Sequence, residues 1–188
     1  MLIDDSGAWV THYYYDADGN LTDSKDWNYY SGSFDWSSTH QRLYFFRDGT
    51  SPNDLMYEEV SVDGQITGNG DSPYHGDYTF TGPIVVSPDQ TNVLLGSGEY
   101  YDSLTLSRVG SISRNFDHAV YLDNGRLAII RKNGVDTILV YYDTAYAPVP
   151  GVTTIPGEPV SLSYHNNQLT VVTYDVIQGL VPFQVDNP

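Results

Sequence analysis

Cysteine is absent from the sequence, which excludes disulfide bonds, thiolate metal sites and cysteine nucleophiles. Basic residues are scarce, because 8 Lys and Arg face 24 Asp and Glu, and the formal net charge is −16. Phosphate backbones and anionic lipid surfaces repel such a chain, so we expect no nucleic-acid partner and no membrane partner. Long hydrophobic runs are also missing, and none approaches the roughly 18 residues of a membrane span. The first residues, Met1-Leu2-Ile3-Asp4-Asp5, do not have the pattern of a signal peptide.

Tyrosine and glycine are abundant, with 17 residues each among 188, and the chain is long enough for one domain with a sizeable core. Helical periodicity is hard to find along it. Short apolar runs instead alternate with clusters of Gly, Pro, Asn and Asp, a pattern typical of strands joined by turns. The sequence therefore predicts an all-β fold.

The predicted strands recur in groups of four, labelled a to d within each group. The b strands begin near Leu43, Val93, Leu127 and Leu169, about 50, 34 and 42 residues apart. The average is close to a four-stranded propeller blade of roughly 40 to 45 residues. We predict a single β-propeller domain of about four to five blades, with approximate bounds 1–27, 28–78, 79–116, 117–158 and 159–188. The first blade lacks an a strand and the last a d strand, which predicts a fragment of a larger propeller, or self-association through open edges.

The stretch from Asp16 to Asp23 permits two interpretations. Its acidic and amide side chains, on Asp16, Asp18, Asn20 and Asp23, are oxygen ligands of the kind that calcium prefers, but their spacing departs from that of an EF-hand loop. Asp18-Gly19 also matches Asp63-Gly64, and Asp-Gly favours a hairpin because the turn needs positive φ. We interpret both dipeptides as c–d hairpins and expect no cofactor, with calcium as the alternative.

Two parts of the chain resemble known propeller repeats. Phe34-Asp35-Trp36-Ser37-Ser38, followed by Arg42-Leu43-Tyr44-Phe45-Phe46-Arg47-Asp48-Gly49 and Asn53-Asp54-Leu55-Met56-Tyr57, is similar to a TolB-type β-propeller repeat. Val85-Val86-Ser87-Pro88-Asp89 with Val93-Leu94-Leu95-Gly96 resembles the wider, WD-like propeller pattern. The resemblance implies the fold and leaves the function open, because propellers host enzymes, binders and scaffolds.

In propellers the b–c and d–a loops share one face, which is often the binding face. Loops predicted at 48–54, 99–102, 27–30 and 69–78 place aromatic and acidic side chains there. We predict ligand contacts from Trp27, Tyr30, Asp48, Asp54, Asp71, Tyr74, His75, Asp77, Tyr100 and Tyr101. Aromatic planes next to carboxylate and hydroxyl groups suit sugars or cations, and the alternative is a solvated acidic rim without a ligand.

We interpret the chain as a non-enzymatic binding or interaction module of a larger bacterial envelope or secreted protein, with a protein or a carbohydrate as its ligand. This interpretation places it in the periplasm or outside the cell. The first alternative is a carbohydrate-active enzyme with catalysts among Asp48, Asp54, Asp71 and Asp77, and the second is a structural spacer. Carboxylate pairs are weak evidence for a glycosidase here, because 24 acidic residues make such pairs inevitable.

Overall fold

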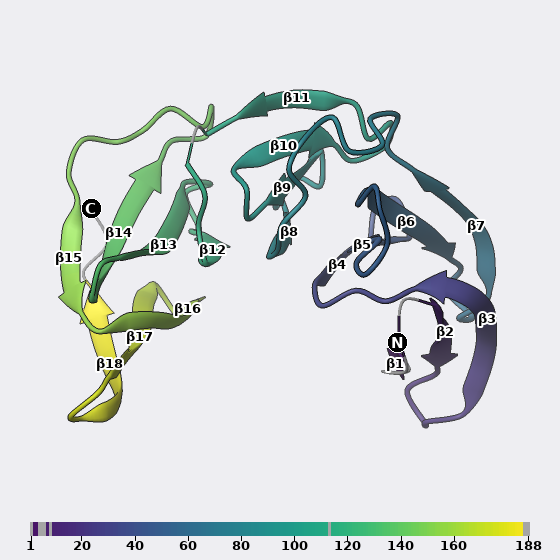
Figure 1. Ribbon diagram of the computed structural model, residues 1–188, viewed down its shortest axis with the longest axis horizontal. Helices are drawn as coiled ribbons and strands as arrows, with labels where there is room; N and C mark the ends of the chain where they lie inside the picture. The colour runs from purple at the N-terminus through teal and green to yellow at the C-terminus, as the bar shows by residue number, and fades with distance from the viewer. Residues whose placement is uncertain (1, 4–6, 8, 113, 186–188) are drawn as a thin grey trace. The chain divides into compact units, whose positions relative to one another are not determined.

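The computed structural model describes residues 2, 3, 7, 9–112 and 114–185, and every regular element in them is a β-strand (Figure 1). These strands form five antiparallel sheets, three with four strands and two with three. Each strand pairs with the strand that is next to it in the sequence, so every sheet is a simple meander. The predicted all-β fold of four-stranded antiparallel sheets is confirmed. The described part of the chain contains no helix with the length and apolar character needed to cross a membrane.

The chain divides into two compact units. Unit 1 comprises Met1–Leu95 and Tyr100–Gly110, and unit 2 comprises Gly96–Glu99 and Ser111–Pro188. Unit 1 holds all or most of three sheets, formed by β1 (Leu2–Ile3), β2 (Trp9–Tyr15) and β3 (Leu21–Tyr29); by β4 (Phe34–Ser37), β5 (Arg42–Phe46), β6 (Leu55–Val60) and β7 (Ile66–Asp71); and by β8 (Ile84–Val86), β9 (Asn92–Leu95), β10 (Glu99–Asp102) and β11 (Arg108–Ser111). Unit 2 holds two, formed by β12 (His118–Tyr121), β13 (Leu127–Asn133), β14 (Asp136–Tyr142) and β15 (Thr153–Pro156), and by β16 (Glu158–His165), β17 (Gln168–Asp175) and β18 (Gly179–Val185).

The main core of unit 1 joins its second and third sheets. Strand β5 is buried along its whole length and supplies the fully buried rings of Tyr44 and Phe46. These rings belong to one cluster with Leu55 of β6, Val93 of β9 and Tyr101 of β10. Burial of an apolar side chain of this size contributes about 1.5 to 3 kcal/mol. The core therefore fixes the ends of β5 and β6, from which the loop between them leaves.

A separate hydrophobic core joins the two sheets of unit 2. Ala128 and Ile130 of β13 lie in one buried cluster with Leu139 of β14, Leu162 of β16 and Leu169 of β17. Alternate residues of a strand point to the same face of a sheet, so Ala128 and Ile130 face this cluster together. The predicted pattern of short buried strands is thus present in both units.

The third sheet differs from the prediction in its strand bounds. Glu99–Asp102, which we predicted as a b–c loop, is strand β10, and its Tyr100 is opposite Leu94 of β9. The connection from β9 is only the turn at Gly96–Gly98, so the c strand begins earlier than predicted. The predicted c strand at 104–109 instead spans part of a turn and the start of β11.

Two further strands are longer than predicted. Strand β7 continues to Asp71, so Asn69 and Gly70 belong to a strand and not to the d–a loop. Strand β3 continues to Tyr29 and includes Trp27. The d–a connections are therefore shorter than the sequence indicated, and Trp27, Asn69 and Gly70 lie near the ends of strands.

A buried polar cluster joins the first and second sheets of unit 1. Glu58 of β6 is fully buried, and its carboxylate accepts hydrogen bonds from the Tyr14 hydroxyl (2.6 Å) and the Asn28 amide. Nδ1 of the fully buried His12 lies 3.0 Å from Glu58 Oε2, and Lys25 Nζ lies 3.4 Å from Oε1. Burial alone would raise the pKa of Glu58, but the hydrogen bonds from His12 and Tyr14 and the charges of His12 and Lys25 hold it below its ordinary value.

Candidate functional site

The predicted binding loops of unit 1 are joined by backbone and side-chain hydrogen bonds around Asp48. The Asp48 N–H donates to the Tyr30 carbonyl (3.0 Å), and Asp48 Oδ2 accepts from the Gly32 N–H (3.1 Å). Asp48 Oδ1 accepts from Asn53 Nδ2 (3.2 Å), so both carboxylate oxygens hold the loop. We call the surface that these loops form the loop face and define it by Trp9, Trp27, Tyr29, Tyr30, Arg47, Asp48, Asp54, Asp71, Tyr74, His75 and Asp77.

Exposed aromatic rings form one end of the loop face. Trp27 is 79% exposed and Trp9 is 49% exposed, and their ring centroids lie 6.2 Å apart. The Trp9 centroid lies 4.9 Å from that of Tyr29, whose centroid is 5.5 Å from the guanidinium carbon of Arg47. Sequence reasoning found Trp27 but missed Trp9, which is directly opposite Tyr29 in the β2–β3 register. Rings with this much free surface are available to stack on a flat ligand.

One histidine and two aspartates form the other end of the loop face. Asp54 is fully buried, and its Oδ1 accepts hydrogen bonds from the Ser72 hydroxyl and the Leu55 N–H (2.8 Å). Nδ1 of His75 lies 2.8 Å from Asp54 Oδ2 and 3.8 Å from Asp71 Oδ2. The ligand atoms of Asp54, Asp71 and His75 all lie within 4.8 Å of one another, so these are the residues here that could hold a metal ion. Asp54 already has a partner at each oxygen, which fits a buried acceptor that anchors the His75 ring.

Tyr74 and Asp77 are close in sequence to His75, which contacts Asp54. The Tyr74 hydroxyl accepts a hydrogen bond from the Arg108 N–H (2.9 Å), and its ring meets Tyr78 edge-on at 5.0 Å. The Asp77 N–H donates to the Tyr74 carbonyl (2.9 Å), and the Asp77 residue is exposed. Tyr74 is thus held in place at both its ring and its backbone, while the exposed Asp77 lies beside it.

Tyr100 and Tyr101, which we predicted as ligand contacts, do not join the loop face. Tyr101 is fully buried in the core, where its ring stacks on Phe80 at 5.9 Å. The Tyr100 ring covers Gly110 of β11, because a Cβ added there would lie 2.6 Å from the Tyr100 hydroxyl. Successive residues of a strand point to opposite faces, so the two rings separate once the segment is a strand.

The stretch from Asp16 to Asp23 contains the turn between β2 and β3, as predicted. The Asn20 side chain donates to Asp16 Oδ2 (2.9 Å), and the N–H groups of Asn20 and Asp18 donate to Oδ1 (2.8 and 3.0 Å). These hydrogen bonds, from Asn20 first, lower the pKa of the exposed Asp16. Asp23 Oδ2 accepts from the Ile66 N–H instead (2.8 Å). Within the described residues, the acids of this stretch do not form a group of three ligand atoms.

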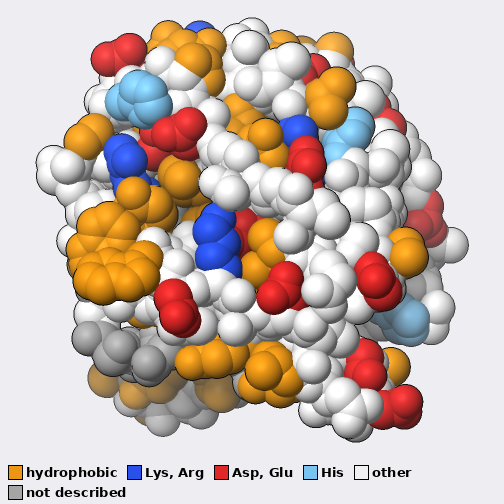
Figure 2. Space-filling view, turned by 90° about the vertical axis from the view of Figure 1, so that its right-hand side faces the viewer, with side chains coloured by type: hydrophobic (Ala, Val, Ile, Leu, Met, Phe, Trp, Pro, Cys, Tyr) orange, Lys and Arg blue, Asp and Glu red, His pale blue; other side chains and the backbone are white. Residues whose placement is uncertain are grey.

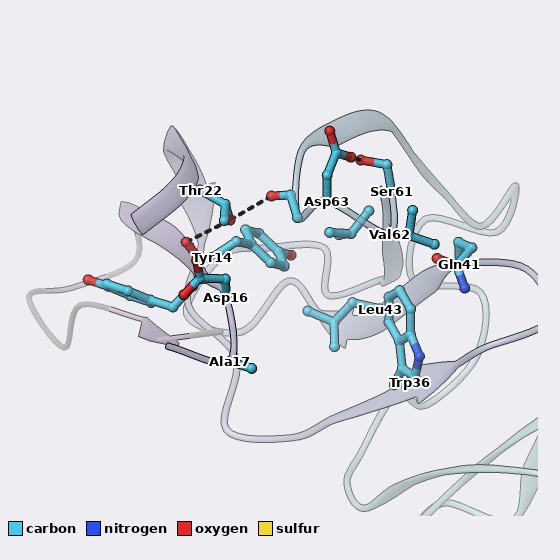
Figure 3. Close-up of a pocket in the computed structure, with 13 residues that line it drawn as sticks. Tyr14, Asp16, Ala17, Thr22, Trp36, Gln41, Leu43, Ser61, Val62 and Asp63 are labelled. Atoms are coloured by element: carbon cyan, nitrogen blue, oxygen red, sulfur yellow. Dashed lines mark hydrogen bonds between the residues drawn. The ribbon is translucent and has the colours of Figure 1, made fainter. Parts of the chain in front are cut away.

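A pocket of about 510 Å³ lies at the other end of β6, between the β2–β3 and β6–β7 hairpins (Figure 3). Tyr14, Leu43 and Val60 form a buried apolar cluster at this pocket. The sequence did not predict this pocket, because only the b–c and d–a loops were expected to form a site. The signal was the repeated Asp-Gly pair, since both of its copies, at 18–19 and 63–64, belong to the hairpins that border the pocket.

Charge alone does not mark a site on the face drawn in Figure 2. On the face drawn in Figure 2, acidic side chains are scattered among polar and apolar ones and do not gather in one patch. The loop face also carries Arg47 and His75 next to its acids, so it is less acidic than its loops suggested. Geometry therefore has to decide between candidate sites.

The comparisons with solved structures agree on one fold. A chain of Kuenenia stuttgartiensis hydrazine synthase matches with a TM-score of 0.71 and 15% identity, over 97% of this chain and 58% of that one. The Dos1 propeller matches with a TM-score of 0.65 and 12% identity, over 96% and 56%. The fold is β-propeller-like. A putative 6-phosphogluconolactonase from Bacteroides uniformis has a TM-score of 0.53 and 11% identity, over 98% and 70%.

This propeller-like chain spans little more than half the length of the first two matching structures. Identities of this size show the fold alone, so the activities in those names belong to those proteins. No family model matches the sequence, and the comparison with curated proteins finds no match. The antiparallel sheets described above are consistent with a propeller-like fold, and the function has to be argued from the chain's own residues.

Proposed function

We propose that the chain is a non-enzymatic binding module that recognises its ligand on the loop face. The proposal rests on one continuous set of contacts. The exposed Trp27 ring lies by the Trp9 ring, and the Trp9 ring lies by Tyr29. The Tyr29 ring lies by Arg47, whose backbone N–H donates to the Asp54 carbonyl (3.0 Å). Asp54 in turn anchors His75. Flat rings and charged groups are thereby held on one surface, the combination that gives a ligand both contact area and orientation.

A carbohydrate is the ligand class that this surface supports best. Trp27 and Trp9 offer large exposed ring faces for sugar rings. Asp71 and Asp77 are exposed carboxylates, which accept hydrogen bonds from sugar hydroxyls. A protein ligand uses the same features in another way, since Trp, Tyr and Arg are also the residues enriched at the centres of protein interfaces.

The enzymatic alternative has less support from the geometry. Glycosidases need two carboxylates at a defined separation, one of which is free to donate or accept a proton. Asp48 and Asp54 are both committed to hydrogen bonds within the protein, and Asp54 is buried. Only Asp71 and Asp77 of the four predicted catalysts are exposed. A binding role needs none of these groups to change its protonation state.

Affinity electrophoresis on a panel of soluble polysaccharides tests the proposal. We expect at least one polysaccharide to retard the protein, and Trp27→Ala to weaken the apparent affinity about tenfold, because one stacking surface is lost. Trp36→Ala is the matched control, since Trp36 is an exposed tryptophan of unit 1 outside the loop face. The control is expected to migrate like the wild type in every gel.

Each other outcome points to a different role. Retardation that Trp27→Ala leaves unchanged would overturn the loop face as the site. Release of reducing sugar that Asp71→Asn or Asp77→Asn abolishes, with retardation intact, would favour the enzyme. A protein without any ligand that tolerates all of these substitutions would be a structural spacer.

The finer features of the proposal are open to separate tests. We assign the repeat to the TolB type and place the module in a bacterial envelope or secreted protein, in the periplasm or outside the cell. Self-association through outer sheet edges is part of the same proposal, and light scattering measures it. The same measurement with added calcium tests whether Asp16, Asp18, Asn20 and Asp23 bind the ion.

A further inference from the structure

We propose that the pocket between the β2–β3 and β6–β7 hairpins binds a small organic cation that carries an apolar or aromatic body. The pocket lies at the opposite end of β6 from the loop face, and the inference does not depend on the function proposed above. It adds a second site, with a different ligand, to unit 1.

The size and floor of the pocket suit a small molecule. Its volume of about 510 Å³ falls within the range of small-molecule sites, which extends from about 300 to 1,000 Å³. Tyr14, Leu43 and Val60 form its apolar floor, and each of them is at most 7% exposed. The hydroxyl of Tyr14 donates to Glu58, so the ring face is left for the pocket. A ligand body that covers this floor gains hydrophobic contact.

The charge of the lining favours a cation. Asp16 and Asp63 both line the pocket, and no Lys, Arg or His is among the described residues that line it. Neither carboxylate forms an ion pair with a described residue, and both residues are exposed. The two negative charges are therefore uncompensated locally, and they attract positive ligands and repel negative ones.

The aromatic wall adds a second preference for positive charge. Trp36 is 39% exposed and Tyr15 is 42% exposed, and both line the pocket. Figure 3 shows Tyr14, Asp16 and Thr22 on one side of the pocket and Trp36, Gln41 and Leu43 on the other. Ring faces of Trp and Tyr attract ammonium and guanidinium groups through cation–π interactions, with Trp the strongest.

The walls of the pocket are held in place before any ligand arrives. The Thr22 hydroxyl donates to the Gly64 carbonyl (2.9 Å), and the Gln65 amide donates to the Thr22 carbonyl (2.6 Å). The Ile66 N–H donates to Asp23 Oδ2 (2.8 Å), so the two hairpins are joined at three points. A preformed wall reduces the entropy that binding would otherwise have to offset.

A neutral sugar fits this pocket less well than a cation. The hydroxyl groups of Thr22 and Ser61 already donate within the protein, to Gly64 and Asp63 respectively. Much of the remaining polar capacity is that of carboxylate oxygens, which only accept. A ligand that brings several N–H donors and a positive charge matches that capacity.

Three probes with one ring and different charge test the proposal on the full chain. Phenethylamine is cationic at neutral pH, 2-phenylethanol is neutral and phenylacetate is anionic. In a ¹H–¹⁵N NMR titration we expect phenethylamine to shift the Trp36 indole N–H signal saturably, and about tenfold more tightly than the alcohol. Phenylacetate is expected to produce no saturable shift. Raising NaCl from about 0.05 to about 0.5 M should weaken the binding of phenethylamine several-fold, because salt screens the charges of the exposed Asp16 and Asp63.

Two variants and two controls locate the binding. Asp63→Asn is expected to weaken the affinity for phenethylamine about threefold, and Trp36→Ala is expected to weaken it about fivefold or more. For Trp36→Ala, the backbone signals of Gly64 and Val62 replace the indole as the reporter. Asp123→Asn makes the same charge change at an exposed acid outside the lining, and Trp27→Ala removes a tryptophan of the loop face. Neither control is expected to change the affinity.

The proposal is overturned if the amine and the alcohol bind equally, if phenylacetate binds as well as the amine, or if no probe produces a saturable shift. It is also overturned if Asp63→Asn and Trp36→Ala both match the wild type. Should Trp36→Ala fail to fold, the Asp63→Asn titration and the charge series still decide the question. Polysaccharide binding on the loop face is measured separately, so failure of one site is distinguishable from failure of the other.

Discussion

Nδ1 of His12 lies 3.0 Å from Oε2 of Glu58, and neither side chain has any exposed surface. Nε2 of the same ring lies 2.9 Å from the carbonyl oxygen of Tyr29, and Nδ1 also lies 2.9 Å from the amide nitrogen of Asn28. The Glu58 carboxylate is thus buried between the first and second sheets of unit 1, where its hydrogen-bond partners take the place of water.

Glu58→Gln is expected to lower the free energy of unfolding of unit 1 by about 3 to 5 kcal/mol, because it removes the buried carboxylate that pairs with Lys25 and accepts hydrogen bonds from Tyr14 and Asn28. Urea unfolding followed by tryptophan fluorescence measures this loss, since all three tryptophans, Trp9, Trp27 and Trp36, lie in unit 1. Asp26→Asn is the control, because Asp26 is an exposed acid on β3, and we expect it to change the stability by about 0.5 kcal/mol or less. A loss below about 1 kcal/mol for Glu58→Gln would contradict this role of the buried carboxylate.

Low pH is expected to lower the free energy of unfolding of unit 1, because it protonates the Glu58 carboxylate. The pKa of Glu58 is held below its ordinary value of 4.5, so its contribution to stability is fully present above that pH. The contribution is lost as the pH falls from 4.5 through the lowered pKa of the folded state. The free energy of unfolding, plotted against pH across this acidic range, should therefore fall less steeply for Glu58→Gln than for the wild type. Parallel plots for the two proteins would show that Glu58 is not the acid responsible for the loss of stability.

Alanine substitution at two equivalent glycines separates backbone strain from contact between hairpins. Gly19 and Gly64 both have positive φ, 82° and 77°, but only at Gly64 would a Cβ meet another hairpin, 2.4 Å from Thr22 Oγ1. We expect Gly19→Ala to destabilise unit 1 by about 1 kcal/mol and Gly64→Ala by about 2 kcal/mol or more. Thermal unfolding by tryptophan fluorescence compares them. Thr22→Ala should recover part of the Gly64→Ala loss, and equal losses for both glycines would argue against the hairpin contact.

Arg42→Lys is expected to destabilise unit 1 by about 1 to 3 kcal/mol although the charge is kept. The Arg42 guanidinium donates to Glu59 Oε1 through Nη2 (2.8 Å) and Nε (3.2 Å), and it lies 3.9 Å from the centroid of the Tyr57 ring. Nη1 also donates to the Leu104 carbonyl, and an ammonium group cannot reach all of these partners at once. Arg47→Lys is the matched control at a less buried arginine, and a loss as large as that of Arg42→Lys would contradict the role of the guanidinium fork.

The repeat of strands and hairpins could be predicted because its determinants are local. Alternating apolar residues specify a strand, and Asp-Gly specifies the turn at 18–19 and 63–64 from the φ requirement alone. The third sheet was mispredicted because two neighbouring segments, at 99–102 and 104–109, are both compatible with a strand. Which of them pairs with β9 is decided by the turn at Gly96–Gly98, whose length the sequence pattern did not specify.

The candidate sites were less predictable because their residues meet across sheets. Asp54, Asp71 and His75 come from predicted b–c and d–a loops, and they meet because Asp54 directly precedes β6, Asp71 ends β7 and His75 follows it. Trp9 was missed because its contact with Trp27 depends on the β2–β3 register. The partners of Glu58 lie 30 to 46 residues away in the sequence, and no spacing rule connects them.

The buried polar cluster around Glu58 also has a consequence for synthesis. A ribosome completes β2 and β3, with His12 and Asn28, well before it reaches Glu58, which is 30 residues beyond Asn28. Until then the polar groups of His12 and Tyr14 lack their partner on β6, and only water can satisfy them. The polar contacts of the N-terminal sheet are therefore completed only after β6 has been translated.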